Sequence, residues 1–327
     1  MTSLSSAALK AMADDCTLTL TCPAKVNLAL SVARPRADGM HPIASWMVAC
    51  TFGDRIELRR ADGTAEEGGV NAGGSQTHLR AGGLQIVPDN EQPQGVQISV
   101  DWPVEKDLAF RAWRLLESHL GRPLPVTATV RKRIPTGAGL GGGSSDAAAM
   151  LVGLDRLFEL KLSHRLVQLA AALGSDVPFL VGAMQGEPSA LVTGLGERLE
   201  PLPLEGVLYL VLAFPPVECS TPQVYRAFDQ LNPDAPSEAD VGRVRTLAAQ
   251  WPVPQAGPFN DLAEPAMVVQ PRLREHIVAL AAERIPAHIT GSGAGMFIIA
   301  PNHLTAEALA RGVTAITGLP AIATRTP

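Results

Sequence analysis

A glycine-rich loop followed by two serines is the part of this sequence best suited to chemistry. Five glycines fall between positions 137 and 143, and Ser144 and Ser145 follow them. Glycine lets the backbone adopt positive φ and approach a ligand without a Cβ in the way. If a helix begins beside the serines, its unpaired N–H groups face the loop, a geometry that favours phosphate. The pattern therefore predicts a nucleotide phosphate site, whose two hydroxyls could also bind a magnesium ion.

The predicted nucleotide-binding residues run through this loop without a gap. They are Pro135, Thr136, Gly137, Ala138, Gly139, Leu140, Gly141, Gly142, Gly143, Ser144 and Ser145. The loop fits neither of the two common phosphate-binding motifs. The motif G-x-x-x-x-G-K-[ST] needs a lysine before the serine, and none is present. A G-x-G-x-x-G match exists, but no convincing acidic residue that could bind a ribose follows at the end of a later strand. A dinucleotide-binding dehydrogenase, which an NAD titration would test, and a purely structural loop stay open as alternatives.

A second candidate lies in an alternating segment near the N-terminus. In residues 25–32 the larger apolar side chains fall on one face of a strand, and Lys25 and Asn27 fall on the other beside Ala29 and Ser31. These small neighbours leave room for a ligand next to an ammonium and an amide. A half-exposed strand would give the same alternation, so the pattern alone leaves both interpretations open.

The elements that hold these residues follow from periodicity and from breaking residues. Strands are predicted at 17–32 with a break near Pro23, at 43–52 and 55–59 around a Gly53-Asp54 turn, at 126–134, 189–193, 207–213, 287–290 and 296–300, and at the C-terminus. Helices are predicted at 107–120, 147–158, 163–174, 221–231, within 232–257, and at 262–283 and 305–313. Polar residues 61–95 are predicted to form a solvated excursion.

Composition and charge narrow the class of protein. The chain has 327 residues, more than one core usually needs, so two domains are expected. A net charge of -5 without a long basic run argues against a nucleic-acid or membrane-surface binder. No stretch approaches the length of a membrane span, no signal peptide is recognised, and Cys16, Cys22, Cys50 and Cys219 form no C-x-x-C pair. We expect a cytoplasmic protein with free, inert thiols.

The loop at 135–148 resembles the phosphate loop of the GHMP kinase superfamily. Within that superfamily, residues 139–148 are similar to the branch that acts on a cytidine-diphosphate-linked methylerythritol in non-mevalonate isoprenoid synthesis. The other segments that fit are residues 23–28 with 36–41, 174–179, 259–262 and 290–297. These matches follow the family's order over most of the chain, so a kinase is the activity that the resemblance implies.

The resemblance implies an α+β fold of two domains. A ribosomal-protein-S5-domain-2-like domain that binds ATP would span residues 1–182, and a ferredoxin-like domain would span residues 183–327. ATP, accompanied by Mg2+, would phosphorylate the 2-hydroxyl of a small-molecule cytidine diphosphate substrate in the cleft between them. We expect no nucleic-acid or membrane partner, and a monomer or weak homodimer.

The resemblance also implies roles for single residues. Asp176 would be the general base and Lys25 the ammonium beside it, since phosphoryl transfer depends mostly on positioning and electrostatic stabilisation. From the residues alone, Asp176 could instead cap a turn beside Gly174. The implied substrate-binding residues are Asn27, His41, Thr221, Tyr225, Gly291, Ser292 and Gly293, with His41 reading the cytosine edge and Tyr225 stacking on the base. Ordinary structural roles stay open for His41, for Tyr225 and for the loop at 291–295.

One position departs from the family. Its members usually carry tyrosine immediately before the histidine, where this chain has Met40, so one aromatic wall is absent. Base–aromatic stacking is typically about 1–3 kcal/mol, and methionine replaces part of it through its polarizable sulfur. We expect weaker or rearranged cytidine recognition. A kinase of the superfamily that acts on homoserine, mevalonate or a sugar is one alternative. A second alternative is a catalytically silent protein that binds ATP as a sensor. The presence of both Lys25 and Asp176 argues against it.

Overall fold

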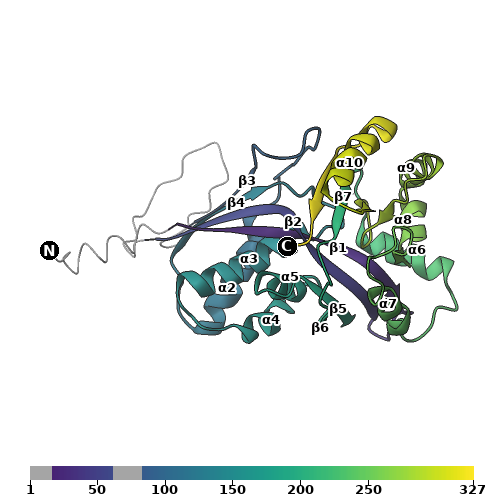
Figure 1. Cartoon of the computed structure of the whole chain (residues 1–327). Coiled ribbons are helices and arrows are strands. Elements are labelled where there is room, and N and C mark those ends of the chain that lie inside the picture. Colours follow the sequence, from purple (N-terminus) through teal and green to yellow (C-terminus); the bar gives the residue numbers. More distant parts are fainter. Residues whose placement is uncertain (1–16, 62–82) are drawn as a thin grey trace.

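The fold consists of two sheets with helices packed on them (Figure 1). It comes from a computed structural model that describes residues 17–61 and 83–327. Within these residues, no helix is long and apolar enough to cross a membrane. The mixed arrangement of helices and strands agrees with the α+β class that the sequence predicts.

The first sheet has seven strands built around a long antiparallel hairpin. Its order is β3-β4-β2-β1-β8, and β5 pairs with both β2 and β6. The strands are β1 (Thr17–Val32), β2 (Ile43–Arg60), β3 (Gly83–Pro88), β4 (Val126–Lys132), β5 (Ser189–Gly194), β6 (Arg198–Pro201) and β8 (Phe259–Asn260). The last three follow residue 182 in the sequence, and the predicted division into domains at that residue stays a prediction.

The hairpin corrects two sequence expectations. β2 is one strand through Gly53, not two strands around a turn, and Gly53 pairs directly with Pro23 of β1. A Cβ on Gly53 would lie 2.0 Å from the carbonyl oxygen of Cys22, so the glycine permits close contact between strands rather than a reversal. The strict alternation of residues 25–32 is also wrong, because the pairing shifts register between Asn27 and Ala29.

Helices cover one face of the first sheet (Figure 1). They are the 3-10 helix η1 (Val104–Lys106), α2 (Leu108–Leu120), α3 (Gly142–Leu157), α4 (His164–Ala170) and α5 (Val177–Met184). The core on this face includes Met47 and Ala49 of β2 and the Ala-rich segment of α3. α3 begins at Gly142, inside the glycine-rich loop and five residues before the predicted start, so its first turn belongs to the candidate site.

The second sheet has four antiparallel strands in the order β11-β7-β10-β9. They are β7 (Tyr209–Ala213), β9 (His288–Ile289), β10 (Met296–Ala300) and β11 (Ala321–Arg325). In chain order this is 4-1-3-2, the arrangement that the expected ferredoxin-like domain requires. Successive side chains of β2 point to opposite faces of the sheet, so Trp46 and Val48 point away from the first core. They form a second core with Phe297 of β10. β2 therefore separates the two cores.

The remaining helices follow residue 220. They are α6 (Thr221–Leu231), α7 (Val241–Ala248), α8 (Ala263–Val269), α9 (Pro271–Ala282) and α10 (His303–Thr317). α10 packs on β7 and β11 of the second sheet, whereas α7 packs on β1 and β2 of the first. The single helix predicted at 262–283 is two helices, because Pro271 starts α9 and Gln270 takes a non-helical conformation between them. The predicted solvated excursion at 61–95 is also wrong in part: β3 pairs in parallel with β4, and residues 62–82 lie outside the described part.

Candidate active site

Lys25 and Asp176 meet between the N-terminal strand β1 and the start of α5. Lys25 Nζ lies 3.4 Å from Asp176 Oδ2 and donates a hydrogen bond of 2.7 Å to Asn27 Oδ1. The lysine side chain is 5% exposed and the aspartate 25%, so the carboxylate is the partner that an incoming group can reach. Although Asp176 stands directly before α5, its side chain makes no capping bond, which argues against the turn-capping alternative.

Asn27 orients the lysine. Its Nδ2 donates to Ser45 Oγ at 2.8 Å, and Ser45 Oγ donates in turn to the carbonyl oxygen of Ala29 at 2.7 Å. Thr290 Oγ1 donates to Asn27 Oδ1 at 3.3 Å. Asn27 is 2% exposed, and both the oxygen and the nitrogen of its side-chain amide bind protein groups. The role that the structure shows for Asn27 is therefore to hold Lys25. A hydrogen bond from Asn27 to substrate stays a prediction.

The glycine-rich loop lies against the second glycine loop, at residues 291–295. The backbone N–H of Ala294 donates to the carbonyl oxygen of Gly137, and that of Gly295 donates to Ala138, both at 3.0 Å. Ser292 Oγ lies 2.9 Å from Thr221 Oγ1 and so connects the second loop to α6. The structure thus brings together the predicted residues of the phosphate loop, of the 291–295 loop and of α6.

The glycine-rich loop forms one wall of a cavity of about 420 Å³. Ser144 lines this cavity beside the first turn of α3. Ser145 is fully buried, and its hydroxyl donates to the carbonyl oxygen of Pro23 at 2.7 Å. Of the two serines, Ser144 is therefore the one whose hydroxyl is placed to meet a phosphate oxygen or a magnesium ion.

We expect Gly139→Ala to disrupt this contact between loops. Gly139 has φ +66°, and a Cβ there would lie 2.6 Å from the carbonyl oxygen of Thr290 and 2.8 Å from that of Gly293. Positive φ alone costs alanine roughly 1–2 kcal/mol, and overpacking adds typically 1–3 kcal/mol. Thermal denaturation should show a lower Tm, and titration should show weaker Mg-ATP binding.

The matched control for that variant is Gly121→Ala at the end of α2. Gly121 has nearly the same φ, +65°, but a Cβ there has no heavy atom within 4 Å. It should therefore show the cost of the backbone conformation alone and leave Mg-ATP binding unchanged. Equal loss of stability in the two variants would contradict a steric contact between the loops.

A second cavity, of about 470 Å³, lies next to the Lys25–Asp176 pair. Its lining includes Ser175, adjacent to Asp176, and Met40, His41, Thr221 and Tyr225. The Met40 side chain is exposed, in the place where the family usually carries tyrosine. The sequence missed two charged residues of this lining, Arg226 and Asp229, since nothing in the amphipathic pattern of α6 marks them as more than surface residues.

His41 and Tyr225 form a packed aromatic wall in this cavity, with ring centroids 4.8 Å apart. His41 Nδ1 lies 2.9 Å from the carbonyl oxygen of Ala33, so this nitrogen carries the proton that it donates. Nε2 faces Asp229 Oδ1 at 3.6 Å. Burial, with a smaller contribution from the Asp176 carboxylate, raises the pKa of Tyr225 to about 12, so its phenol remains a hydrogen-bond donor at neutral pH.

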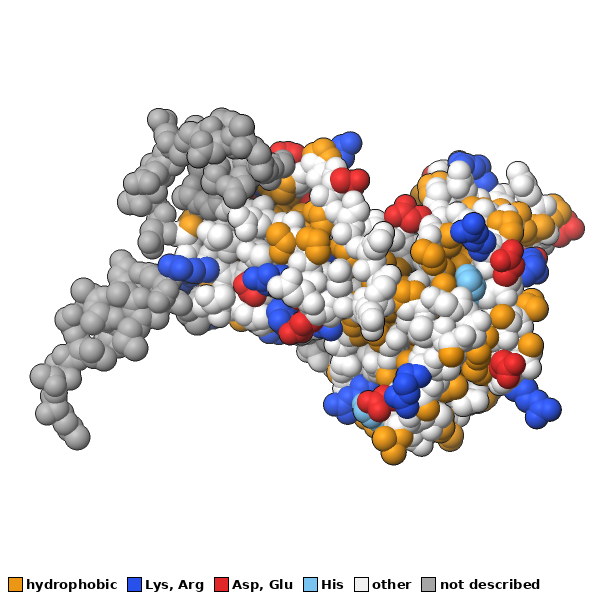
Figure 2. All heavy atoms as spheres, turned by 90° about the horizontal axis from the view of Figure 1, so that it is seen from above, with side chains coloured by type: hydrophobic (Ala, Val, Ile, Leu, Met, Phe, Trp, Pro, Cys, Tyr) orange, Lys and Arg blue, Asp and Glu red, His pale blue; other side chains and the backbone are white. Residues whose placement is uncertain are grey.

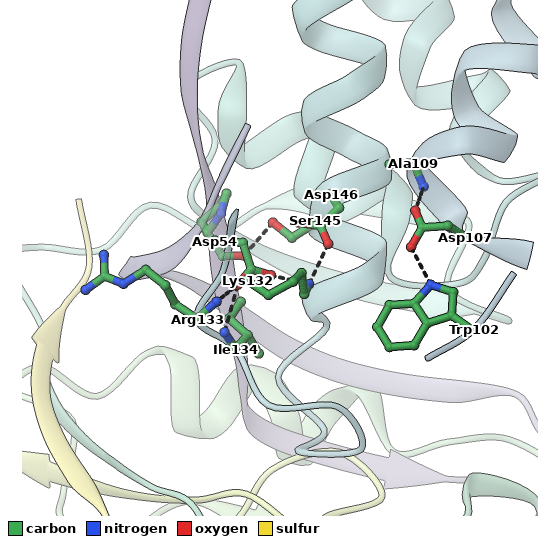
Figure 3. A network of polar contacts seen from close by, with 10 residues as sticks. Asp54, Trp102, Asp107, Ala109, Lys132, Arg133, Ile134, Ser145 and Asp146 are labelled. Carbon is green, nitrogen blue, oxygen red and sulfur yellow. Dashed lines mark hydrogen bonds and ion pairs between the residues drawn. The ribbon is translucent and has the colours of Figure 1, made fainter. Parts of the chain in front are cut away.

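A buried group of charges joins the strand before the glycine-rich loop to the helix after it (Figure 3). Lys132 Nζ donates to the carboxylates of Asp54 in β2 and Asp146 in α3, and all three residues are at most 4% exposed. Asp54 also accepts from the backbone N–H groups of Arg133 and Ile134. This Lys132 network, which sequence reasoning missed, fixes both ends of the loop.

Burial sets the electrostatics of the Lys132 network. It raises the pKa of the Asp146 carboxyl well above its usual range, although the Lys132 ammonium acts in the opposite direction. For Lys132 itself, burial lowers the pKa, but Asp146 and Asp54 outweigh that effect and the net change is upward. Lys132 is therefore protonated near neutral pH, and its ammonium is held by two carboxylates.

The three cysteines within the described residues line neither cavity. Cys22, Cys50 and Cys219 are free and buried, while Cys16 lies outside the described residues. Burial raises the pKa of the Cys50 thiol to about 12 and that of Cys219 to about 11. Because the thiolate is the reactive form, these thiols are inert near neutral pH, as the sequence predicts.

Comparison with known proteins identifies the class of protein. Residues 107–183, which include the glycine-rich loop, match the GHMP kinases N terminal domain. A 4-diphosphocytidyl-2-C-methyl-D-erythritol kinase of Symbiobacterium thermophilum is 36% identical over 86% of this chain and 90% of the relative. The enzyme of that name from Thermobifida fusca is 34% identical over 91% of this chain and 92% of the relative.

Solved structures give the same result. A crystal structure of 4-(cytidine 5'-diphospho)-2C-methyl-D-erythritol kinase matches with a TM-score of 0.70 and 31% identity, covering 95% of this chain and all of that one. Homoserine kinase of Cytophaga hutchinsonii, at 16% identity and a TM-score of 0.63, shares the fold. The fold is that of a GHMP kinase. Within that class, the chain belongs to the family of 4-diphosphocytidyl-2-C-methyl-D-erythritol kinases.

Proposed function

We propose that this chain transfers the γ-phosphoryl group of ATP to the 2-hydroxyl of 4-diphosphocytidyl-2-C-methyl-D-erythritol, giving the 2-phosphate and ADP for isoprenoid precursor synthesis. The observation that carries the proposal is the position of the Lys25–Asp176 pair between two cavities. A Cβ on Gly141, which lines the loop cavity, would lie 3.0 Å from Lys25 Cγ, and Ser175 beside Asp176 lines the other cavity. A donor and an acceptor can therefore meet at this pair.

The chemistry follows from that placement. The glycine-rich loop would hold the triphosphate with backbone N–H groups, while His41 and Tyr225 hold the cytidine end of the acceptor. As the acceptor oxygen bonds to the γ-phosphorus, the bond to the β–γ bridging oxygen breaks and ADP leaves. The hydroxyl proton passes to Asp176, and the Lys25 ammonium stabilises negative charge on the attacking oxygen.

We also propose that Mg2+ accompanies ATP. Magnesium usually retains several waters and takes few protein ligands besides the phosphates. Ser144, at the first turn of α3, provides one hydroxyl in the loop cavity, and residues 17–61 and 83–327 contain no cluster of three or more His, Cys, Asp or Glu that could hold a metal. These residues fit a metal held mainly by the nucleotide, whose chemistry is to neutralise phosphate charge.

The mixed surface charge suits a small-molecule enzyme better than a polyanion binder. On the face shown in Figure 2, acidic and basic side chains are interspersed over the described residues rather than separated by sign. We propose that the protein works in the cytoplasm as a monomer or weak homodimer. Gel filtration with light scattering would test the oligomeric state.

A panel of acceptors tests the proposed reaction. Purified protein with Mg-ATP should show a kcat/KM for 4-diphosphocytidyl-2-C-methyl-D-erythritol at least about 100-fold above that for homoserine or mevalonate, because His41 and Tyr225 would hold a base that the other two acceptors lack. Phosphorus NMR of the product would locate the new phosphate on the 2-hydroxyl. Preferential turnover of homoserine or mevalonate would show that the substrate is wrong, and ATP binding without turnover of any acceptor would favour a silent sensor.

A further inference from the structure

The glycine-rich loop runs from the catalytic pair toward the N-terminus of α2. A Cβ on Gly141 would lie 3.0 Å from Lys25 Cγ, one on Gly142 would lie 3.4 Å from Lys132 Nζ, and one on Gly143 would lie 3.6 Å from Leu108 Cδ1. The loop cavity thus has a catalytic end at Gly141 and a far end at Leu108. A nucleotide whose γ-phosphate reaches Lys25 extends its base toward the far end.

An immobilised indole stands at that far end (Figure 3). Trp102 is half-buried, lines the loop cavity, and donates from Nε1 to Asp107 Oδ2 at 2.9 Å. The other oxygen of Asp107 accepts from the backbone N–H of Ala109 at 2.8 Å and caps α2. One buried carboxylate therefore fixes the indole to the start of a helix, and the indole is oriented before any ligand arrives.

We propose that Trp102 is the platform on which the base of the nucleotide stacks, with Asp107 as its positioning residue. The inference rests on the proposed function in one respect: the γ-phosphate must point toward Lys25. Trp102 is the single aromatic side chain among the described residues that line this cavity. A fixed ring loses little conformational freedom on binding, which is the reason that such platforms are effective.

The proposed stacking predicts different effects on ligands that carry a base and on ligands that carry phosphates alone. Losing a base–aromatic stack costs about 1–3 kcal/mol, which corresponds to roughly 5- to 150-fold in Kd at 1.4 kcal/mol per factor of ten. Trp102→Ala should raise the Kd of Mg-ATP by that factor and raise KM for ATP in parallel. Inorganic tripolyphosphate with Mg2+, which has no base, should bind both proteins equally. Trp102→Phe should recover part of the affinity for ATP.

Intrinsic fluorescence gives an independent readout. Mg-ATP should quench part of the wild-type emission, and Trp102→Phe should abolish that change. The matched control is Trp251→Phe, since Trp251 is also partly buried but packs against the core between the two sheets, outside the loop cavity. Asp107→Asn should weaken Mg-ATP binding by a smaller factor than Trp102→Ala, because the indole stays present but loses its fixed orientation.

Three outcomes would overturn the platform. They are equal weakening of Mg-ATP and tripolyphosphate in Trp102→Ala, unchanged Mg-ATP binding in that variant, and quenching by Mg-ATP that persists in Trp102→Phe. If Trp102→Ala does not fold, the titrations of Trp102→Phe and Trp251→Phe decide the question. Failure of the proposed function is distinguishable, since a wild type that binds Mg-ATP on Trp102 but phosphorylates no acceptor would leave the platform intact.

Discussion

Asp176→Asn is expected to lower kcat by about 100- to 10,000-fold, the range that general acid–base catalysis usually supplies. Asparagine keeps the size of the side chain and can still accept from Lys25 Nζ, which lies 3.4 Å from the native carboxylate. It cannot take the proton of the acceptor hydroxyl. Because Asp176 is absent from the lining of the loop cavity, the Kd of Mg-ATP should stay within about threefold, as expected for a group used only in the transition state.

Rapid-quench kinetics with Mg-ATP would separate the chemical step from ATP binding in that variant. The matched control is Asp234→Asn, an exposed aspartate on the segment between α6 and α7 that lines neither cavity. It should leave both kcat and Kd unchanged. A kcat in Asp176→Asn close to that of the wild type would rule out a proton acceptor at this position, while an equal loss in kcat and in ATP affinity would indicate a structural role.

The sequence allowed the chemistry-bearing loops to be predicted because each motif is continuous. Residues 135–145 indicate a phosphate site through their glycines and the two serines that follow. The helix 107–120 was predicted from its apolar spacing and its terminal Gly121, and the structure confirms that helix. The family and the α+β fold are confirmed by the relatives and by the two sheets. The catalytic and substrate-binding roles of individual residues stay predictions, although the structure brings those residues together.

The contacts that hold these loops together could not be predicted, since they join distant segments. The Ser145 hydroxyl bonds to Pro23, 122 positions away, and Asn27 meets Thr290 across 263 positions. Gly53 looked like a turn because periodicity cannot distinguish a reversal from a close approach of two strands. Trp102 stands in a segment whose only regular structure is the short 3-10 helix η1, so it offered no periodic pattern to interpret.

Lys132→Met is expected to be the most destabilising of the substitutions considered. It leaves Asp54 and Asp146 buried beside each other without a cation, and breaking a buried ion pair in this way typically costs about 3–5 kcal/mol. One oxygen of Asp146 already has no hydrogen-bond partner among the described residues, so no spare donor compensates there. Chemical denaturation should show the loss in the free energy of unfolding, and Mg-ATP binding should weaken because both ends of the phosphate loop are released.

A triple variant separates the two origins of that loss. In Lys132→Met with Asp54→Asn and Asp146→Asn, no charge remains buried, and the amide oxygen introduced at position 54 would still accept from the N–H groups of Arg133 and Ile134. If uncompensated carboxylates cause the loss, the triple variant should regain at least half of the unfolding free energy, since buried ion networks are often replaceable without net cost. If it stays as unstable as Lys132→Met, the attraction to the ammonium is itself what holds β4 to α3. In either case the affinity for Mg-ATP shows separately whether the phosphate loop needs the Lys132 charge or only a stable contact between β4 and α3.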